Sequence, residues 1–224
     1  LSLHDYGQRI NQWFDRVAAE EEPPTREQLR VLWRVAERIL TEYREDKMYD
    51  DRSPSTTEPL LGLILGLPDT GKSRVLQWIR EMFEEALGWK HEEQFICVAF
   101  QNRMAAMIAG TTFHADLPRP GEDRDRKLEH SDVDNLYVRN SALRWVLFDE
   151  ISMVADGLLG DFEAQFTSAA RQTRYAKRPD GSKRIFGGYN VLTFGDWWQL
   201  PPVPDSGALF LPPHEDASKD GKFE

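Results

Sequence analysis

Short apolar runs alternate with segments of helical periodicity through the central part of the chain. Four runs lack strict alternation of apolar and polar residues, which is typical of strands buried on both faces of a parallel sheet. They lie at 60–65, 95–99, 145–148 and 191–194. Apolar residues at helical spacing lie between them, at 74–87, 102–109 and 154–173. This alternation of strands and helices predicts an α/β fold, with a parallel sheet flanked by helices.

The first part of the chain is predicted to be helical. Apolar residues recur at helical spacing from Leu3 to Val17, and Pro23 ends that helix. A second amphipathic helix follows, because Thr25 is a good N-cap and Gln28, three residues later, completes a capping box. The polar, proline-containing stretch 47–59 is typical of a linker or an exposed loop.

These patterns predict an N-terminal helical segment (1–50), one α/β domain (58–212) and a disordered tail (213–224). Within the domain, the stretch 119–140 is charged and lacks periodicity, so we expect a surface insertion there. The stretch 177–188 is basic and contains glycine, which predicts a second loop.

A glycine-rich loop follows the first predicted strand: residues 66–73 read Gly-Leu-Pro-Asp-Thr-Gly-Lys-Ser and fit G-x-x-x-x-G-K-[ST], the phosphate-binding P-loop. Glycines let backbone N–H groups surround phosphate oxygens, and the N-terminus of the next helix adds positive partial charge. We expect Lys72 to reach the β- and γ-phosphates of ATP and the Ser73 hydroxyl to hold Mg²⁺. The residues predicted to bind the nucleotide are Gly66, Pro68, Asp69, Thr70, Gly71, Lys72, Ser73 and Arg74. The alternative is a glycine turn with a chance Lys-Ser pair, which the flanking strand and helix disfavour.

The third predicted strand ends in two carboxylates, Asp149 and Glu150. Ligands collect at the carboxyl edge of parallel sheets, so these acids are expected to face the P-loop. Asp149 would hold Mg²⁺ through water, and Glu150 would polarise the water that attacks the γ-phosphate. The alternative is an acidic turn in which one carboxylate caps a helix.

Polar residues also follow the second and the last predicted strands. Gln199, in the stretch 195–203, could donate a hydrogen bond to the γ-phosphate, although a glycine-proline loop with packed tryptophans explains the same residues. The stretches 100–106 and 110–114 could bring polar groups to a bound nucleic acid strand, with His114 contacting a phosphate or a base. By spacing alone, the surface reading of His114 is favoured, because a lone histidine is more often just a surface residue.

Composition limits the classes of protein to consider. No apolar run approaches the length that spans a bilayer, so no membrane partner is expected. Cys97 is the single cysteine, which rules out a disulfide within the chain and fits an intracellular, reducing compartment; its apolar neighbours indicate a core position. The net charge of −10 argues against a nucleic acid partner. That argument is limited, because binding depends on the local groove and the acidic clusters look peripheral.

The order of the motifs resembles the first motor domain of the PIF (petite integration frequency) family of DNA helicases, in superfamily one. The P-loop resembles the family's motif I, and residues 147–154 match its D-E-x-S-M signature. Residues 195–203 match its G-D-x-x-Q-L-P-P-V motif, and 100–106 with 110–114 resemble the motif that touches single-stranded DNA. The resemblance runs from about Pro24 to Val203.

The resemblance implies a RecA-like P-loop NTPase domain that couples ATP hydrolysis, with Mg²⁺, to 5′-to-3′ movement on single-stranded DNA and to unwinding. The catalytic residues it implies are Lys72, Asp149, Glu150 and Gln199, and Gln28 would read the adenine ring. The DNA-binding residues it implies are Gln101, Asn102, Arg103, Thr112 and His114. A role in DNA repair, recombination or telomere maintenance follows, in the nucleus or a mitochondrion if the source is eukaryotic.

The chain departs from the family pattern at two places. Asp69 stands where the family usually has a small residue, which adds negative charge beside the triphosphate. The family's Ser-Thr-Gly is replaced by residues 101–103, Gln-Asn-Arg, which can still donate hydrogen bonds. We also expect the second motor domain to be missing, because the sequence stops shortly after the Gln199 motif. A fragment without it would hydrolyse ATP slowly and would not unwind DNA.

Two other functions fit parts of the sequence. A P-loop kinase for a nucleotide or small molecule fits the loop and the acidic charge, although 119–140 is a poor candidate for its lid. A non-catalytic remnant that binds nucleotide or a partner protein fits the short chain and Asp69. The composition and the motifs say nothing about the oligomeric state.

Overall fold

The computed structural model describes residues 2–49, 53–99, 111–112, 142–154, 156–170 and 173–196. Five strands form one sheet in the order β1-β5-β4-β2-β3, and every pair of neighbours is parallel. The strands are β1 (Leu61–Leu65), β2 (Phe95–Ala99), β3 (Thr111–Thr112), β4 (Trp145–Asp149) and β5 (Asn190–Gly195). The predicted α/β fold is therefore confirmed, and no end of the four predicted strands differs from the structure by more than one residue. The sequence pattern did not predict β3, because two residues carry no periodicity.

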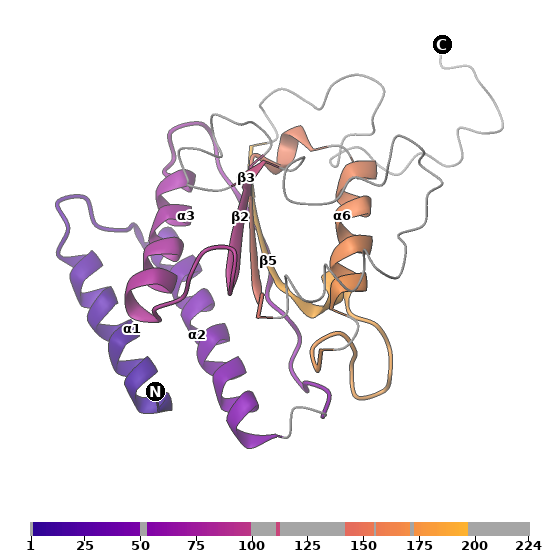
Figure 1. Cartoon of the computed structure of the whole chain (residues 1–224). Helices are drawn as coiled ribbons and strands as arrows, with labels where there is room; N and C mark the ends of the chain where they lie inside the picture. The colour runs from indigo at the N-terminus through magenta and orange to yellow at the C-terminus, as the bar shows by residue number, and fades with distance from the viewer. Residues whose placement is uncertain are drawn as a thin grey trace, which may run out of the picture.

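Helices cover both faces of this sheet (Figure 1). One layer consists of α1 (Leu3–Ala18), α2 (Arg26–Met48) and α3 (Lys72–Glu81), which runs on into a π-helical turn at Met82–Ala86. The opposite face carries α6 (Asp156–Ala169). Short 3₁₀ turns lie at Ile151–Met153 and Ile185–Gly188.

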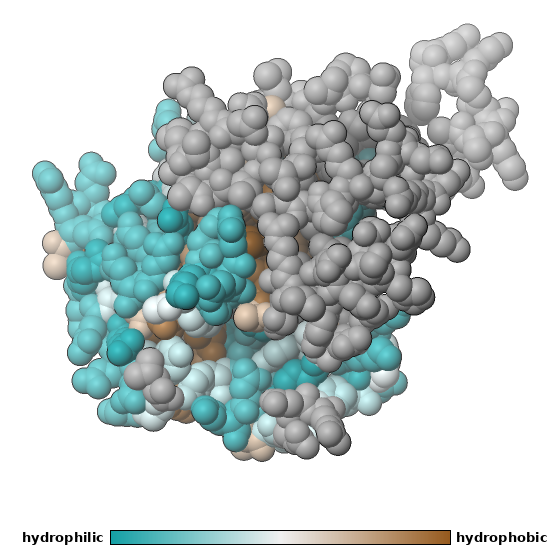
Figure 2. Space-filling model, in the orientation of Figure 1, coloured by the Kyte–Doolittle hydropathy of each residue, from teal (hydrophilic) through white to brown (hydrophobic). Residues whose placement is uncertain are grey.

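Two apolar cores separate the sheet from the helices. Alternate strand residues such as Cys97, Leu147 and Leu192 pack against the layer of α1 to α3. Their neighbours on the strands, such as Val146, face the other way and pack against α6. The outward surface of the helical layer is mostly hydrophilic (Figure 2), as expected of helices with one apolar stripe. Cys97 is fully buried, which confirms its core position, and burial raises the pKa of its thiol to about 12.

Helix α2 begins where the sequence predicted. The backbone N–H of Thr25 donates to Gln28 Oε1 (2.8 Å), and the N–H of Gln28 donates to Thr25 Oγ1 (3.3 Å), which is a complete capping box. Its other end was predicted wrongly, because Lys47 and Met48 belong to the helix and not to the linker. The final turns of α2 bury Glu42 and Glu45. Because these residues are acidic, the apolar pattern along the sequence does not show that this part of the helix is buried.

A buried polar network joins α2 to the amino ends of the strands. Glu42 Oε1 accepts hydrogen bonds from Arg38 Nη2 (2.7 Å), Arg144 Nη2 (2.5 Å) and Asn190 Nδ2 (2.9 Å). Asn190 Oδ1 in turn accepts from the backbone N–H of Leu60 (2.8 Å), just before β1. Burial would raise the pKa of Glu42, but Arg144 and Arg38 outweigh it and lower the pKa. One carboxylate therefore connects α2, β5 and the approaches to β1 and β4.

Glu45, one turn further along α2, holds the segment that leads to β1. Its carboxylate accepts hydrogen bonds from Ser55 Oγ, from Thr56 N and Oγ1, each at 2.6 Å, and from Thr57 N (3.2 Å). Burial would raise the pKa of Glu45, but these donors outweigh it and lower the pKa to about 2. Residues 55–57 of the segment predicted as a linker are thus anchored to the last turns of α2.

Strand β1 lies at one end of the sheet formed by the described strands, with one face uncovered. Leu61, Leu63 and Leu65 are 47%, 52% and 49% exposed, whereas strands of parallel sheets are usually covered on both faces.

Among the described helices, none combines the length and apolar composition that a membrane span requires.

Replacing Glu45 tests the anchoring of residues 55–57. We expect Glu45→Gln to lower the free energy of unfolding at pH 7 by about 1–3 kcal/mol, because a neutral amide cannot accept this set of hydrogen bonds. A carboxyl whose pKa is lowered on folding stabilises the native state above its unfolded value of 4.5, and that stabilisation is lost as the pH falls toward about 2. Urea denaturation at pH 7 and pH 3 should therefore show a smaller difference at pH 3. Glu37→Gln, an exposed position of the same helix, is the control; an equal effect at both sites would contradict the account.

Candidate nucleotide-binding site

The sheet brings the ends of β1, β4 and β5 to the same edge. Leu65 is in register with Gly195, and the N–H of Gly66 donates to the carbonyl of Gly195 (3.3 Å). Phe148 of β4 is in register with Thr193, so Asp149 and Glu150 follow at that same edge. The predicted P-loop and the predicted acids therefore share one rim of the sheet, as the spacing of the motifs required.

Backbone conformation at two residues shapes the loop between β1 and α3. Gly71 is the N-cap of α3 with a φ of +82°, a left-handed conformation that favours glycine. Asp69 has a φ of +61°, which is uncommon for a residue with a side chain. The helix begins at Lys72, so its first free N–H groups open toward the loop.

A hollow of about 420 Å³ lies beside this loop and is lined by Pro68, Asp69, Gly71, Lys72, Ser73 and Glu150. The Lys72 ammonium is turned onto its own loop, where Nζ donates to the carbonyls of Gly66 (2.5 Å) and Leu67 (2.8 Å). Free backbone donors, an ammonium and a carboxylate thus border one small space. This combination suits a phosphate group accompanied by a cation.

Two of the acids at this rim have raised pKa values. Asp149 is 2% exposed, and burial raises its pKa although the Glu150 N–H donates to its Oδ1 (3.0 Å) and Lys72 is near. Burial also raises the pKa of Glu150, and Asp149 and Asp196 add to that rise against the pull of Lys72. Glu150 has a φ of +56°, so the backbone is left-handed at this residue too.

The oxygens of these two acids fit a divalent cation. Asp149 Oδ2 and Glu150 Oε2 are both buried and lack a hydrogen-bond partner in the part of the chain that the structure describes. A buried carboxylate oxygen without a partner is costly. Carboxylate and hydroxyl oxygens are the ligands that Mg²⁺ prefers. Asp149 with the Ser73 hydroxyl is therefore a chemically suitable donor set for that ion.

Gln28, from the start of α2, lies against the glycine loop. A Cβ added at Gly71 would come within 2.6 Å of Gln28 Nε2, so only glycine leaves room for this approach. Gln28 does not line the hollow itself. The structure thus brings together two segments that are far apart in the sequence.

Other predicted site residues lie elsewhere or outside the described part of the chain. Arg74 does not line the hollow: it pairs with Glu20, just after α1 (2.7 Å), and lies over the ring of Trp78 on its own helix (4.7 Å). Thr112 belongs to β3 at the far end of the sheet. The residues outside the described ranges are Gln101, Asn102, Arg103, His114 and Gln199.

Sequence reasoning missed Asp196 as a member of this site. It follows β5, is 2% exposed, and contributes to the raised pKa of Glu150. The signal was available, because it stands directly after an apolar strand, where Asp149 and Glu150 also stand.

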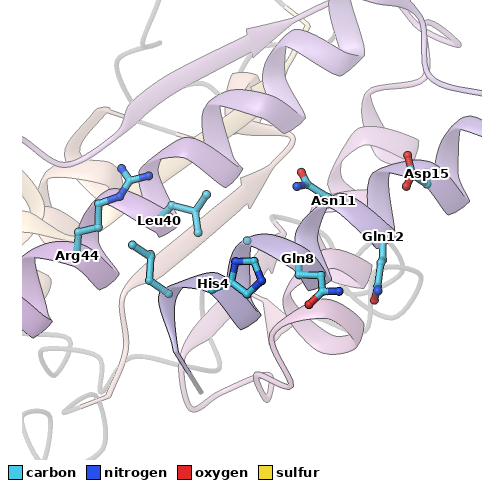
Figure 3. A pocket seen from close by; sticks show the side chains of 9 residues that line it. His4, Gln8, Asn11, Gln12, Asp15, Leu40 and Arg44 are labelled. Carbon is cyan, nitrogen blue, oxygen red and sulfur yellow. The ribbon is translucent and has the colours of Figure 1, made fainter.

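A second hollow, of about 690 Å³, lies along α1 and α2 (Figure 3). Polar side chains of α1, such as His4, Gln8 and Asn11, form one side, and Leu40 and Arg44 of α2 form the other. It has no glycine-rich backbone and no paired acids, so nucleotide chemistry is assigned to the site at the sheet edge.

Comparison with known proteins finds PIF1 helicases. The ATP-dependent DNA helicase PIF1 of Emericella nidulans is 31% identical over 144 residues, which make up 62% of this chain and 18% of that protein. The crystal structure of the Pif1 helicase from Candida albicans matches with a TM-score of 0.57 at 21% identity, over 85% of this chain and 36% of that one. The Bacteroides Pif1 helicase in complex with ADP-AlF3 and ssDNA has a TM-score of 0.49 at 22% identity, over 82% of this chain and 34% of that one. No family model matches the sequence.

The chain spans a minor part of each of these relatives, 18% of the curated protein and 36% of the Candida albicans chain. Within that part, the matched sequence and the shared parallel sheet agree with the motifs described above. This part of the chain is similar in sequence to a PIF1 helicase, and it shares the fold of the matched part of the Candida albicans Pif1 structure.

Proposed function

We propose that this chain binds ATP with Mg²⁺ at the edge of the sheet and hydrolyses it. The observation that carries the proposal is the hollow at the sheet edge, whose lining includes the glycine loop, Lys72 and Glu150, the neighbour of buried Asp149. The backbone N–H groups at the start of α3 would bind phosphate oxygens. Lys72 would leave the carbonyls of Gly66 and Leu67 to reach the β- and γ-phosphates.

The other side chains of the site would each have a separate role. Ser73 and Asp149 would hold Mg²⁺, which neutralises charge on the phosphates when bound. Glu150 would accept a proton from the attacking water, a role suited to a carboxylate with a raised pKa. Gln199 would contact the γ-phosphate and would change position when hydrolysis removes that phosphate. Asp69 also lines the hollow, and its negative charge would weaken the binding of the triphosphate.

We propose further that the domain is one motor of a DNA helicase. The support is the PIF1 relationship together with the DNA helicase activity named for the Emericella nidulans protein. Single-stranded DNA would bind through Gln101, Asn102, Arg103, Thr112 and His114. Movement would be 5′ to 3′, in the service of DNA repair, recombination or telomere maintenance, and would require a second motor domain that closes on the same ATP.

Removing the P-loop ammonium tests the nucleotide site. Lys72→Ala should weaken Mg·ATP binding at least about tenfold, because a hydrogen bond to a charged group contributes about 1.5–3 kcal/mol. Calorimetric titration of the chain with Mg·ATP measures this. Lys90→Ala, at an exposed lysine away from the loop, should bind as the unchanged chain does. Equal affinities in all three proteins would exclude this loop as the phosphate site.

Removing the proton acceptor separates binding from hydrolysis. Glu150→Gln should bind Mg·ATP within a few-fold of the unchanged chain but hydrolyse it about 10²- to 10⁴-fold more slowly, the usual loss for a general base. Single-turnover hydrolysis with protein in excess over ATP, with and without single-stranded DNA, measures this. A variant that hydrolyses ATP at the original rate would rule out Glu150 as the base. Stimulation by a small acceptor instead of DNA would favour a kinase.

The site should also reduce the stability of the nucleotide-free protein. We expect Asp149→Asn to raise the free energy of unfolding at pH 7 by about 1 kcal/mol, because it removes a charge from a buried position. Folding raises the pKa of Asp149 above its usual 3.8, so the native state loses stability as the pH rises through that raised value. The gain from Asp149→Asn should therefore shrink between pH 7 and pH 4. Urea denaturation with EDTA checks both values, with exposed Asp15→Asn as the control; a less stable Asp149→Asn at pH 7 would contradict the assignment.

A further inference from the structure

An aromatic stack extends the hollow that lies along α1 and α2 (Figure 3). Phe14 of α1 stacks on Trp33 of α2, with the ring centroids 4.1 Å apart and 9° between the ring planes. Asp15, next to Phe14, lines the hollow. Leu40 and Arg44 line it too, and they follow Trp33 at the spacing of one helix face. Trp33 is 51% exposed, so part of its indole is open to solvent beside the hollow.

A row of unpaired arginines runs along the same side of α2. Arg26, Arg30 and Arg34 recur every four residues, and all three are exposed. Arg44 returns to the side of Arg26, because 18 residues make about five helical turns. Within the described ranges, none of these four guanidinium groups has an ion pair or a hydrogen bond. Like charges four residues apart destabilise a helix, so the row has a cost that no contact between described residues offsets.

The remainder of this surface is polar. The carboxamides of Gln8, Asn11 and Gln12 line the α1 side of the hollow, and each has both donor and acceptor groups. Asp15 and the exposed Glu37 reduce the positive charge of the surface without cancelling it. The centres of protein interfaces are apolar and depleted of charged residues, which this surface is not. Guanidinium groups beside an open aromatic ring suit the phosphates and bases of a nucleic acid strand instead.

We propose that this α1–α2 surface, which consists of the hollow, Trp33 and the arginines at 26, 30 and 34, binds single-stranded nucleic acid. The arginines would contact phosphates, and one base would stack on the open part of Trp33. Successive arginines of the row lie about 6 Å apart along the helix axis, a step close to that between phosphates of an extended strand. The inference goes beyond the proposed function, which assigns DNA to residues 101–103, 112 and 114. It also gives a local positive surface to a chain with a net charge of −10.

Oligonucleotide binding tests the surface. Fluorescence anisotropy with dT and rU oligomers of about 12 nucleotides should give a Kd of about 10⁻⁴–10⁻⁶ M at physiological salt. The slope of log K against log salt should be about −2 to −3, because three or four arginines would neutralise phosphates. A preference for one oligomer would identify the strand as DNA or RNA. Failure of both to bind would overturn the inference. Tighter binding of an oligoglutamate peptide would overturn it in favour of an acidic protein partner.

Two double variants with the same loss of charge test the arginine row. Arg30→Ala with Arg34→Ala should weaken dT binding at least about tenfold and should make the salt slope shallower by about 1 to 1.5. Arg9→Ala with Lys90→Ala removes two exposed charges that do not line the hollow, and it should bind nearly as the unchanged chain does. Equal losses in both variants would show that net charge alone matters and would overturn the inference.

Replacing Trp33 tests the stacking. Trp33→Ala should weaken dT binding at least about fivefold, whereas Trp33→Phe should retain most of the affinity because it keeps a flat ring. A strand of abasic sites has phosphates but no bases, so it should bind the unchanged chain and Trp33→Ala equally. Circular dichroism confirms that the variants fold. Unchanged dT binding by Trp33→Ala would show that no base stacks at this position.

Photo-cross-linking separates this surface from the DNA site of the proposed function. An oligonucleotide that carries iodouracil, followed by mass spectrometry, should cross-link to peptides of α1 or α2. Cross-links confined to residues 100–114 would overturn this inference and would leave the proposed motor standing. Conversely, a chain that does not bind Mg·ATP but still cross-links at Trp33 would refute the proposed function alone.

Discussion

The carboxylate of Glu42 is the interaction on which the arrangement of this molecule depends. It receives hydrogen bonds from Arg38 on its own helix, Arg144 before β4 and Asn190 at the start of β5. Burying these charges is costly, and the cost is recovered only when every partner is present. Removal of one partner would leave uncompensated charge in the interior. The network therefore favours a single register between α2 and the amino ends of the strands.

Helix α2 transmits that register to the other edge of the sheet. The helix rises about 1.5 Å per residue, so Gln28 lies about 20 Å from Glu42 along a rigid rod. At that distance a small change in the angle of the helix would move Gln28 away from Gly71. The polar network at one edge of the sheet and the approach of Gln28 to the glycine loop at the other edge therefore both depend on the orientation of α2. Neither involves the apolar core directly, although the core supplies most of the burial.

The predictable part of this protein is the part encoded in short stretches of sequence. The strand with Asp149 at its end, the glycine loop with Lys72 and the capping box at Thr25 each follow from a few neighbouring residues, and each is present in the structure. The apolar pattern alone indicated parallel strands. The site at the sheet edge followed from the rule that such strands carry their ligands at their carboxyl ends.

The unpredicted features depend on contacts between distant segments. Nothing local to Glu42 or Glu45 signals that a charged residue is buried, because the partners come from 55–57, Arg144 and Asn190. The approach of Gln28 to Gly71 is equally invisible along the chain. The π-helical turn at Met82–Ala86 keeps its apolar residues buried, so its pattern resembles that of an ordinary helix.

The left-handed backbone at Asp69 and Glu150 has a consequence for the evolution of this domain. Each holds a bulky side chain in a conformation that glycine adopts at lower energy, a strain of about 1 kcal/mol or more. Selection for thermal robustness alone would therefore favour glycine at both positions. At Glu150 that gain would remove the proposed proton acceptor, whereas at Asp69 it would remove a charge that opposes the triphosphate. Replacement of Glu150 by glycine would thus stabilise the fold but remove the proposed proton acceptor. Replacement of Asp69 by glycine would stabilise the fold without that loss.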